Sequence, residues 1–283
     1  MKRVCDIGEF GLIRELSQNI PHAGDDCAVL PGGLLLTCDP VVEGIHFLPA
    51  TPARRVGWKA MARNLSDIAA MGGLPRWAVV SIGLRPATPV RWVRELYAGL
   101  HAAARRFDCE IVGGDTTHVK HEQFVVVTLL GQCDRPVLRT GSKIGDSVFV
   151  TGTLGGSRAG KHLTFVPRIK EARWLTAHFD IHAMIDLSDG LASDVQHLLR
   201  PGIRFDLDAV EIPARGSLRA ALTDGEDFEL LFTIDPRAVT ALRTKWKFPV
   251  KLTEIGRVVR GHGARLDGQP LSAKGYDHFP KRR

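Results

Sequence analysis

The sequence has no long apolar run. No stretch approaches the ~20 consecutive apolar residues that a membrane-spanning helix needs. The first six residues lead into a charged segment that lacks the apolar core of a signal peptide. We therefore expect a globular protein that stays in the cytoplasm.

Cysteine is also scarce. The five cysteines are odd in number, widely spaced and mostly set among apolar neighbours, which favours reduced core residues over a disulfide framework. No pair has zinc-finger spacing. The chain has neither a His-Glu-x-x-His helix nor a Gly-x-Ser-x-Gly elbow, so it carries neither the zinc metalloprotease motif nor the serine hydrolase motif.

The length of 283 residues and the 44% hydrophobic content are typical of two domains of ordinary size. We expect a helix to begin near Gly8, a hairpin turn at Gly32-Gly33, and longer helices at Ala53–Met71 and near Val90–Arg106. Strands are expected at Leu34–Cys38 and Cys109–Val112, and the last expected strand is Val250–Arg257. Strands and helices therefore alternate along the chain, which indicates an α/β or α+β layer structure. Turn-forming residues near 135–143 place the boundary between an N-terminal domain at 1–138 and a C-terminal domain at 139–283.

The net charge of +7 is uneven, with +1 in residues 1–138 and +6 in residues 139–283. The second half is therefore the more attractive to anions. Its basic residues are scattered, which favours a phosphorylated small molecule over nucleic acid as the partner.

Six short acidic motifs, most of them beside Gly or Ser, are the most informative feature of the chain. They are Gly24-Asp25-Asp26, Cys38-Asp39, Ser66-Asp67, Gly113-Gly114-Asp115, Asp186-Leu187-Ser188-Asp189-Gly190 and Gly225-Glu226-Asp227. Most follow an apolar run, which predicts a buried strand that delivers its carboxylate at its C-terminal end.

Carboxylates that converge repel one another unless a cation neutralises them. Mg²⁺ prefers oxygen ligands and is commonly held by a few carboxylates together with substrate phosphates, so the acidic motifs predict a magnesium and nucleotide site. Any one motif can also be explained as a turn or a helix cap, which explains the whole set poorly. The segment Gly155 to His162 is close to a phosphate-binding loop, but His162 replaces the hydroxyl residue that holds magnesium. We expect a glycine-rich turn whose amides help to cover phosphates.

Taken together, these stretches resemble the thiamine-monophosphate kinase family, whose superfamily includes aminoimidazole ribonucleotide synthetase and selenophosphate synthetase. The resemblance runs nearly end to end. Its other carrying segments are Gly8-Glu9-Phe10-Gly11-Leu12-Ile13, Val42-Glu43-Gly44-Ile45-His46-Phe47, Asn64-Leu65-Ser66-Asp67-Ile68-Ala69-Ala70-Met71-Gly72, Arg139-Thr140-Gly141 and Lys274-Gly275-Tyr276-Asp277-His278-Phe279. The opening segment, the His46 segment and the closing segment distinguish this family from its superfamily.

The resemblance implies a role for each matching position. The implied magnesium ligands are Asp26, Asp39, Asp67, Asp115, Asp186 and Asp189, with Thr37 and Cys38 beside them. The implied ATP contacts are Gly114, Asp115, Arg139 and Ser188. The implied catalytic residues are Asp67, Asp115, Asp189 and Arg139, and those for thiamine phosphate are His46, Glu226 and Tyr276. For these three, a cationic or donor imidazole, a carboxylate and a stacking ring suit the substrate.

The resemblance further implies a two-domain α/β synthetase-superfamily fold. In it the N-terminal domain forms a homodimer through its sheet and the C-terminal domain closes the ATP cleft. The implied reaction is direct transfer of a phosphoryl group from ATP to thiamine phosphate, assisted by several Mg²⁺ ions.

The chain departs from the family pattern in two places. Cys38-Asp39-Pro40 stands where the family usually has Thr-Asp-Thr, and the stretch from Gly160 to Arg168 is shortened. These departures keep one alternative open, a catalytically impaired nucleotide-binding relative. A second alternative is another ATP-dependent synthetase of the superfamily, which shares the aspartates and ATP but not the thiamine-facing positions.

Overall fold

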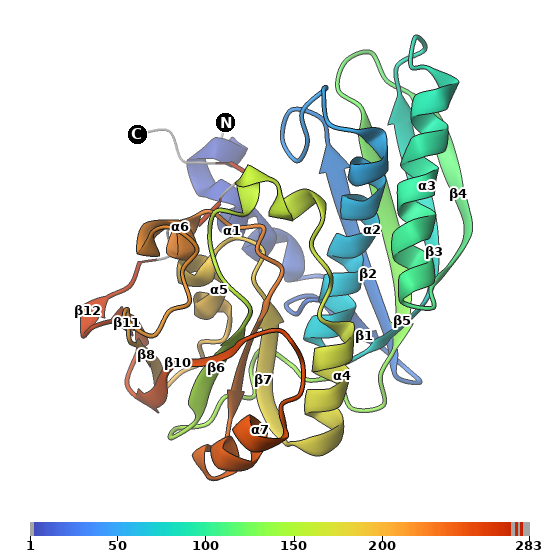
Figure 1. Cartoon of the computed structure of the whole chain (residues 1–283). Coiled ribbons are helices and arrows are strands. Elements are labelled where there is room, and N and C mark those ends of the chain that lie inside the picture. Colours follow the sequence, from blue (N-terminus) through green and yellow to red (C-terminus); the bar gives the residue numbers. More distant parts are fainter. Residues whose placement is uncertain (1–2, 273–274, 277, 280–283) are drawn as a thin grey trace.

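The computed structural model describes residues 3–272, 275, 276, 278 and 279. It contains two β-sheets with helices between and around them (Figure 1). This mixed α/β arrangement confirms the expected fold class. Within the described part of the chain, no helix is long and apolar enough to cross a membrane.

The first sheet has five strands in the order β1-β2-β5-β3-β4. Their bounds are β1 Ala28–Leu30, β2 Leu34–Val42, β3 Leu74–Leu84, β4 Glu110–His118 and β5 Phe124–Gln132. A hairpin joins β1 to β2 through a short loop, in which Gly32 and Gly33 both have positive φ, a conformation that glycine adopts without strain. The glycine pair predicted this turn correctly.

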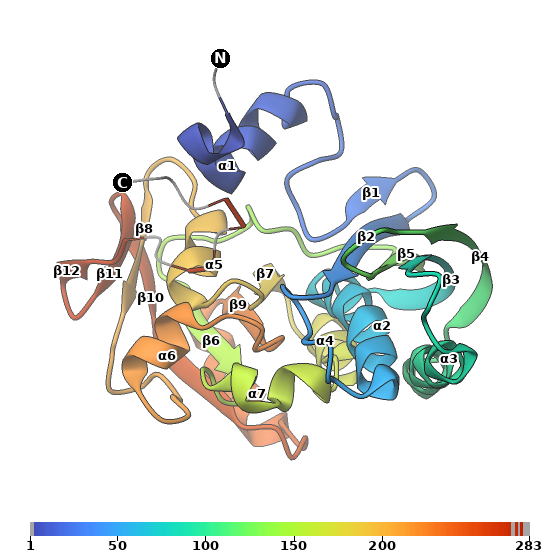
Figure 2. The ribbon, with the colours of Figure 1, turned by 90° about the horizontal axis from the view of Figure 1, so that it is seen from above.

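The two longest helices cover one face of this sheet, α2 at Ala53–Ala70 and α3 at Val90–Arg106 (Figures 1 and 2). They cross very closely, because a Cβ added to Gly57 would lie 1.9 Å from the Leu96 carbonyl oxygen, and one added to Gly99 would lie 1.9 Å from that of Arg54. Helix α2 ends before Gly72, whose φ of 69° stops the helix. Both helices begin at or near the residues that their apolar spacing predicted.

The second sheet has seven strands in the order β12-β11-β8-β10-β6-β9-β7. Their bounds are β6 Ser147–Thr151, β7 Ile181–Asp186, β8 Ile203–Leu207, β9 Leu230–Ile234, β10 Leu252–Arg260, β11 Gly263–Leu266 and β12 Gln269–Pro270. The pairs are antiparallel except for β8 with β11. The helices of this half are α4 Ile169–His178, α5 Leu191–His197, α6 Leu218–Thr223 and α7 Val239–Lys245. The last two strands were not predicted.

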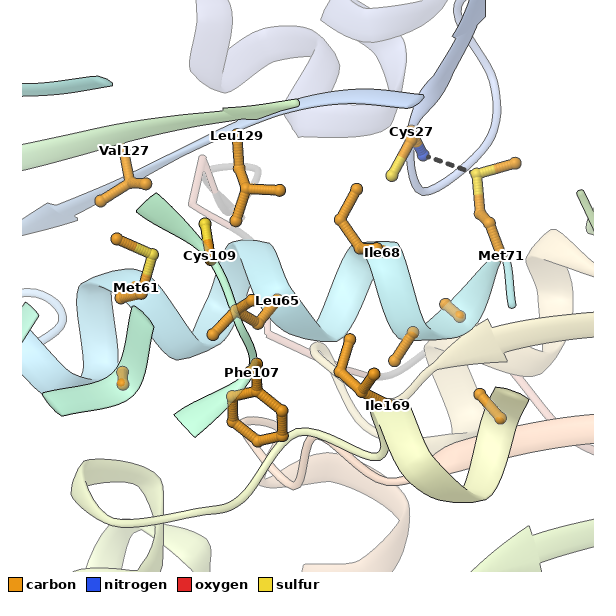
Figure 3. Close-up of a cluster of buried hydrophobic side chains, with 14 of the residues drawn as sticks. Cys27, Met61, Leu65, Ile68, Met71, Phe107, Cys109, Val127, Leu129 and Ile169 are labelled. Atoms are coloured by element: carbon orange, nitrogen blue, oxygen red, sulfur yellow. Dashed lines mark hydrogen bonds between the residues drawn. The ribbon is translucent and has the colours of Figure 1, made fainter. Parts of the chain in front are cut away.

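One apolar core extends across both sheets. Figure 3 shows its centre, where Met61 and Ile68 of α2 face the first sheet and Ile169 of α4 lies on the other side of the helix. Helix α2 also contacts α4 and β7. The division at residue 138 falls between β5 and β6 and stays a proposal, because this shared core joins the two halves.

Helix α1, Val4–Ser17, stands apart from the first sheet and lies beside α5 (Figure 2), where the Phe10 and His197 rings are 5.2 Å apart. It begins four residues before the expected start at Gly8, which has a φ of 71° and kinks it. The acid-delivering strands also differ from expectation. Asp39 and Asp115 lie inside β2 and β4 instead of after them, because both strands continue through the polar motif.

Candidate active site

A cavity of about 590 Å³ opens where the two halves of the chain meet. It is lined by α1, β2, α2, the segment that links β5 to β6, and the residues that follow β7. Ten of the predicted site residues line it, namely Asp26, Thr37, Cys38, Asp39, His46, Asp67, Arg139, Asp186, Ser188 and Asp189. The fold therefore brings together most of the acidic motifs.

Three carboxylates form the centre of this cavity. One oxygen each of Asp26, Asp67 and Asp186 lies within 4.8 Å of the other two. Asp26 precedes β1, Asp67 lies on the last turns of α2, and Asp186 ends β7. The three segments are distant in sequence, so the cluster exists only in the folded chain.

Hydroxyl groups and one guanidinium hold these carboxylates in place. Thr37 Oγ1 donates to Asp67 Oδ2 at 2.5 Å, and Ser66 Oγ donates to Asp186 Oδ2 at 2.5 Å. Arg139 Nη2 lies 2.8 Å from Asp26 Oδ1. The Arg139 amide also donates to Asp25 at 3.0 Å, which fixes the linker beside the cluster.

The cluster carries more negative charge than its protein neighbours balance. Burial, followed by the charges of Asp39, Asp186 and Asp26, raises the pKa of Asp67 well above its usual value. Burial and the charge of Asp26 raise the pKa of Asp186 to about 8. A cation bound at the cluster would favour the ionised forms of Asp67 and Asp186 near neutral pH. An oxygen-only donor set of this kind fits Mg²⁺.

Two more carboxylates lie around the cluster. Asp39 Oδ2 accepts from Arg63 Nε at 3.0 Å, so a cation of α2 already partners it. Burial raises the pKa of Asp189 to about 6. Buried Asp194 accepts from the amides of Asp189 and Gly190, both at 3.1 Å, and so shapes the turn that carries Asp189.

Cys38 is exposed on β2, and its Sγ accepts from Thr128 Oγ1 at 3.3 Å. Its neighbour Thr37 instead points inward to Asp67. The hydroxyl that contacts the cluster therefore comes from Thr37, one position before the Cys38 that replaces the usual threonine of the family.

Gly114 and Asp115 do not lie in the cavity of this chain. Both are exposed on β4, the outer strand of the first sheet, two strands beyond β5. A Cβ at Gly114 would lie 2.0 Å from the Val80 carbonyl oxygen, so this glycine lets β4 pack against β3. The expectation that Asp115 joins the other carboxylates is therefore not met within one chain, because β5 and β3 lie between its strand β4 and the strand β2 that lines the cavity.

A second, narrower cavity adjoins the first, and six residues line both, namely His46, Arg63, Ser188, Asp189, Phe228 and His278. Ile45, Arg158, Glu226 and Tyr276 complete the wall of the second cavity. The Arg158 guanidinium lies 5.2 Å from the centre of the Tyr276 ring, a cation–π contact. The three residues predicted for thiamine phosphate thus line one cavity beside the acidic cluster. Lys274 and Asp277 of the closing segment lie outside the described residues.

His46 is a hydrogen-bond donor of this wall. Burial lowers its pKa to about 3, which favours the neutral imidazole over the cationic alternative. Its Nδ1 accepts from the Val42 amide at 3.1 Å, so the proton lies on Nε2.

Glu226 is an ionised carboxylate. Burial opposes its ionisation, but a hydrogen bond from His162 and the charge of Lys59 hold its pKa at about 2. Lys59 Nζ lies 2.5 Å from Glu226 Oε1, and His162 Nδ1 lies 3.1 Å from Oε2.

Sequence reasoning missed four basic residues, namely Lys59, Arg63, Arg158 and His162. Lys59 and Arg63 lie four residues apart, so they project from the same side of α2. The position of Lys59 within the apolar face of α2 could have indicated a buried ion pair, because lysine is almost never fully buried without a partner.

The glycine-rich turn does not form a phosphate cradle. Two short 3-10 turns follow it, and the amides of Gly155 and Gly156 donate to Asp227 at 2.8 Å and to Asp224 at 3.0 Å. The prediction of a turn in place of a phosphate-binding loop is confirmed. The suggestion that its amides cover phosphates is wrong for these two, which the chain's own carboxylates occupy.

Comparison with known proteins agrees with this geometry. Residues 24–133 match the family model of AIR synthase related protein, N-terminal domain. The thiamine-monophosphate kinase of Aquifex aeolicus is 36% identical over 98% of this chain and 100% of its own length. That of Rhodopirellula baltica is 36% identical over 88% and 86%. The solved structure of AaThiL complexed with AMPPCP and TMP superposes with a TM-score of 0.90 at 35% identity and covers 99% of both chains. This chain therefore belongs to the thiamine-monophosphate kinase family.

Proposed function

We propose that this kinase transfers the γ-phosphoryl group of ATP directly to the phosphate of thiamine phosphate, giving thiamine diphosphate and ADP. The observation that carries the proposal is the contact between two cavities, one centred on Asp26, Asp67 and Asp186 and the other walled by His46, Glu226 and Tyr276. The related AaThiL structure was solved with AMPPCP and TMP bound together, which supports the same pairing of ligands here.

The chemistry requires charge compensation more than proton transfer. The phosphate of the acceptor has a second pKa of about 6, so it is mostly a dianion at neutral pH and needs no general base. Its attack on ATP brings two like-charged groups together, and their repulsion is the main obstacle. Arg63, Arg139 and Arg158 line the cavities and place positive charge around this meeting point.

We propose that Asp26, Asp67 and Asp186 hold Mg²⁺, with Asp39 and Asp189 nearby. The fit rests on the short distances between their oxygens and on the raised pKa values of Asp67 and Asp186. When bound, Mg²⁺ supplies the positive charge that offsets the phosphates of donor and acceptor. Thr37 and Ser66 orient the carboxylates, and Ser188 and Arg139 are proposed to contact ATP.

On the acceptor side, the neutral His46 can donate from Nε2 to a phosphate oxygen. The ionised Glu226 suits the aminopyrimidine or the thiazolium of the substrate, and Tyr276 offers an aromatic face. These three roles are carried over from the family pattern, and the shared cavity supports them.

We further propose that the protein acts as a homodimer. The face of the first sheet that α2 and α3 leave open carries exposed apolar side chains, including Leu36, Trp77, Val79 and Val112. A second copy packed on this face would cover them. In such a dimer Gly114 and Asp115 of the partner subunit can serve the site that they do not reach in their own chain.

A coupled assay of ADP release tests the proposal, with purified protein, ATP, Mg²⁺ and thiamine phosphate. We expect ADP release that depends on thiamine phosphate, with thiamine diphosphate as the product. Unphosphorylated thiamine is the matched control and should give no ADP, because it lacks the attacking phosphate. ADP release at the same rate with and without thiamine phosphate would overturn the proposed function.

A further inference from the structure

Lys59 is a fully buried lysine next to the acceptor cavity. Its side chain is 0% exposed, and it lines neither of the two cavities described above. It can therefore affect the substrate only through the residues that it holds.

The ammonium group of Lys59 joins three segments that are distant in sequence. Its Nζ lies 2.5 Å from Glu226 Oε1, 2.7 Å from the His46 carbonyl oxygen and 2.9 Å from His162 Nδ1. An ammonium has three N–H donors, and three acceptors are in place. His162 Nδ1 serves one partner at a time, and the tautomer of the ring decides which: without a hydrogen Nδ1 accepts from Lys59, and with one it donates to Glu226.

The segments that Lys59 joins form the wall of the acceptor cavity. Glu226 has a φ of 56°, an unfavourable backbone conformation for a residue other than glycine, and its surroundings must enforce it. Its amide donates to the Ser188 carbonyl at 2.7 Å, and its own carbonyl accepts from Ser157 Oγ at 2.5 Å. These contacts fix the backbone, while Lys59 and His162 fix the carboxylate.

Stability alone does not explain this lysine. Burial of its charge is costly, as the lowering of its pKa to about 8 by desolvation shows. An apolar side chain of similar size often serves a protein interior as well as, or better than, a buried ion pair.

We propose that Lys59 is a positioning residue of the acceptor site, which fixes the Glu226 carboxylate and the backbone at His46 where they meet thiamine phosphate. This inference rests on the function proposed above. His162, from the shortened stretch between Gly160 and Arg168, also contacts the Glu226 carboxylate and helps to position it.

The test is a double-mutant cycle of Lys59→Met and Glu226→Gln, with KM measured separately for thiamine phosphate and for ATP. We expect Lys59→Met to raise the KM for thiamine phosphate by about tenfold or more and to change the KM for ATP by less than about twofold. In the Glu226→Gln background, the same substitution should add less than about threefold, because the carboxylate that Lys59 holds is already gone. Arg55→Met, an exposed site on the same helix, is the control and should leave both KM values unchanged.

Thermal unfolding of each variant accompanies the kinetics. If Lys59→Met alone does not fold, the doubly substituted protein is compared with Glu226→Gln, since it leaves no unpaired buried charge. Two results with an active wild type would overturn this inference alone. In the first, Lys59→Met leaves the KM for thiamine phosphate unchanged; in the second, the KM effects of Lys59→Met and Glu226→Gln multiply in the double variant. A wild type inactive on thiamine phosphate would overturn the proposed function and the inference together.

Discussion

Replacing Asp186 by Asn tests the metal-free state of the acidic cluster most directly. Asp186 is buried, and its pKa of about 8 lies far above the 3.8 of an exposed aspartate. Between these two values the folded protein holds a proton on Asp186 that the unfolded chain has lost. Raising the pH therefore removes stability, starting near pH 4 and continuing to about pH 8.

The size of the effect follows from the same numbers. While only the folded state carries the proton, each pH unit costs about 1.4 kcal/mol, so the step from pH 5.5 to pH 8 costs about 3 kcal/mol. Coulomb repulsion within the cluster is of similar size, since two unit charges at the 4.8 Å limit of its oxygen separations repel by about 3.5 kcal/mol at an effective dielectric constant of ~20. Asn cannot ionise, so Asp186→Asn should escape this loss.

The assay is urea unfolding at pH 5.5 and pH 8, in a metal chelator and again in Mg²⁺. In chelator, we expect the variant to gain about 3 kcal/mol relative to wild type between the two pH values. Adding Mg²⁺ at pH 8 should stabilise the wild type more than the variant, because we propose that the folded cluster binds the ion. Asp134→Asn, at an exposed position, is the control.

Two results would refute this reasoning. If the wild type and Asp186→Asn lose stability in parallel from pH 5.5 to pH 8 in chelator, Asp186 does not hold a proton in the folded state. If Mg²⁺ stabilises both proteins equally, the ion does not bind at this cluster.

Three further predictions concern activity, packing and assembly. Asp67→Asn and Asp189→Asn should each abolish thiamine diphosphate formation while urea unfolding stays cooperative, and near-normal turnover in both would contradict the assigned cluster. Gly57→Ala should cost about 3 kcal/mol of unfolding free energy, because its Cβ would lie 1.9 Å from a backbone oxygen of α3, whereas Gly113→Ala, with 3.9 Å of clearance, should cost far less. Trp77→Glu should convert the proposed dimer to a monomer in analytical ultracentrifugation, whereas Val90→Glu, on the opposite side of the sheet, should not. A wild-type monomer would show that the open sheet face has another role.

Local patterns in the sequence predicted much of the fold. The apolar spacing of α2 and α3, the Gly32–Gly33 turn and the glycine after α2 depend on neighbouring residues only, so their geometry can be read directly. The limits of β4 were misjudged, because an outer strand with exposed side chains has no apolar pattern beyond its first residues.

The candidate site divides in the same way. Short motifs of Asp beside Gly or Ser predicted the carboxylates of the cluster, because a carboxylate side chain can bind a cation wherever the fold places it. Asp115 was grouped with the others on the same chemistry, yet the order of the strands places it on the far edge of the sheet. Composition cannot show which strand lies at an edge.

The sequence by itself determined the family, the layered α/β architecture and the acids that can bind a cation, since each depends on residue type and short-range spacing. Only the tertiary structure decided which groups meet. Lys59, His162 and Glu226 are separated by more than 60 residues at each step, and packing alone sets the few ångströms between their charged atoms. The contacts that position a substrate depend on this long-range packing, which no local pattern encodes.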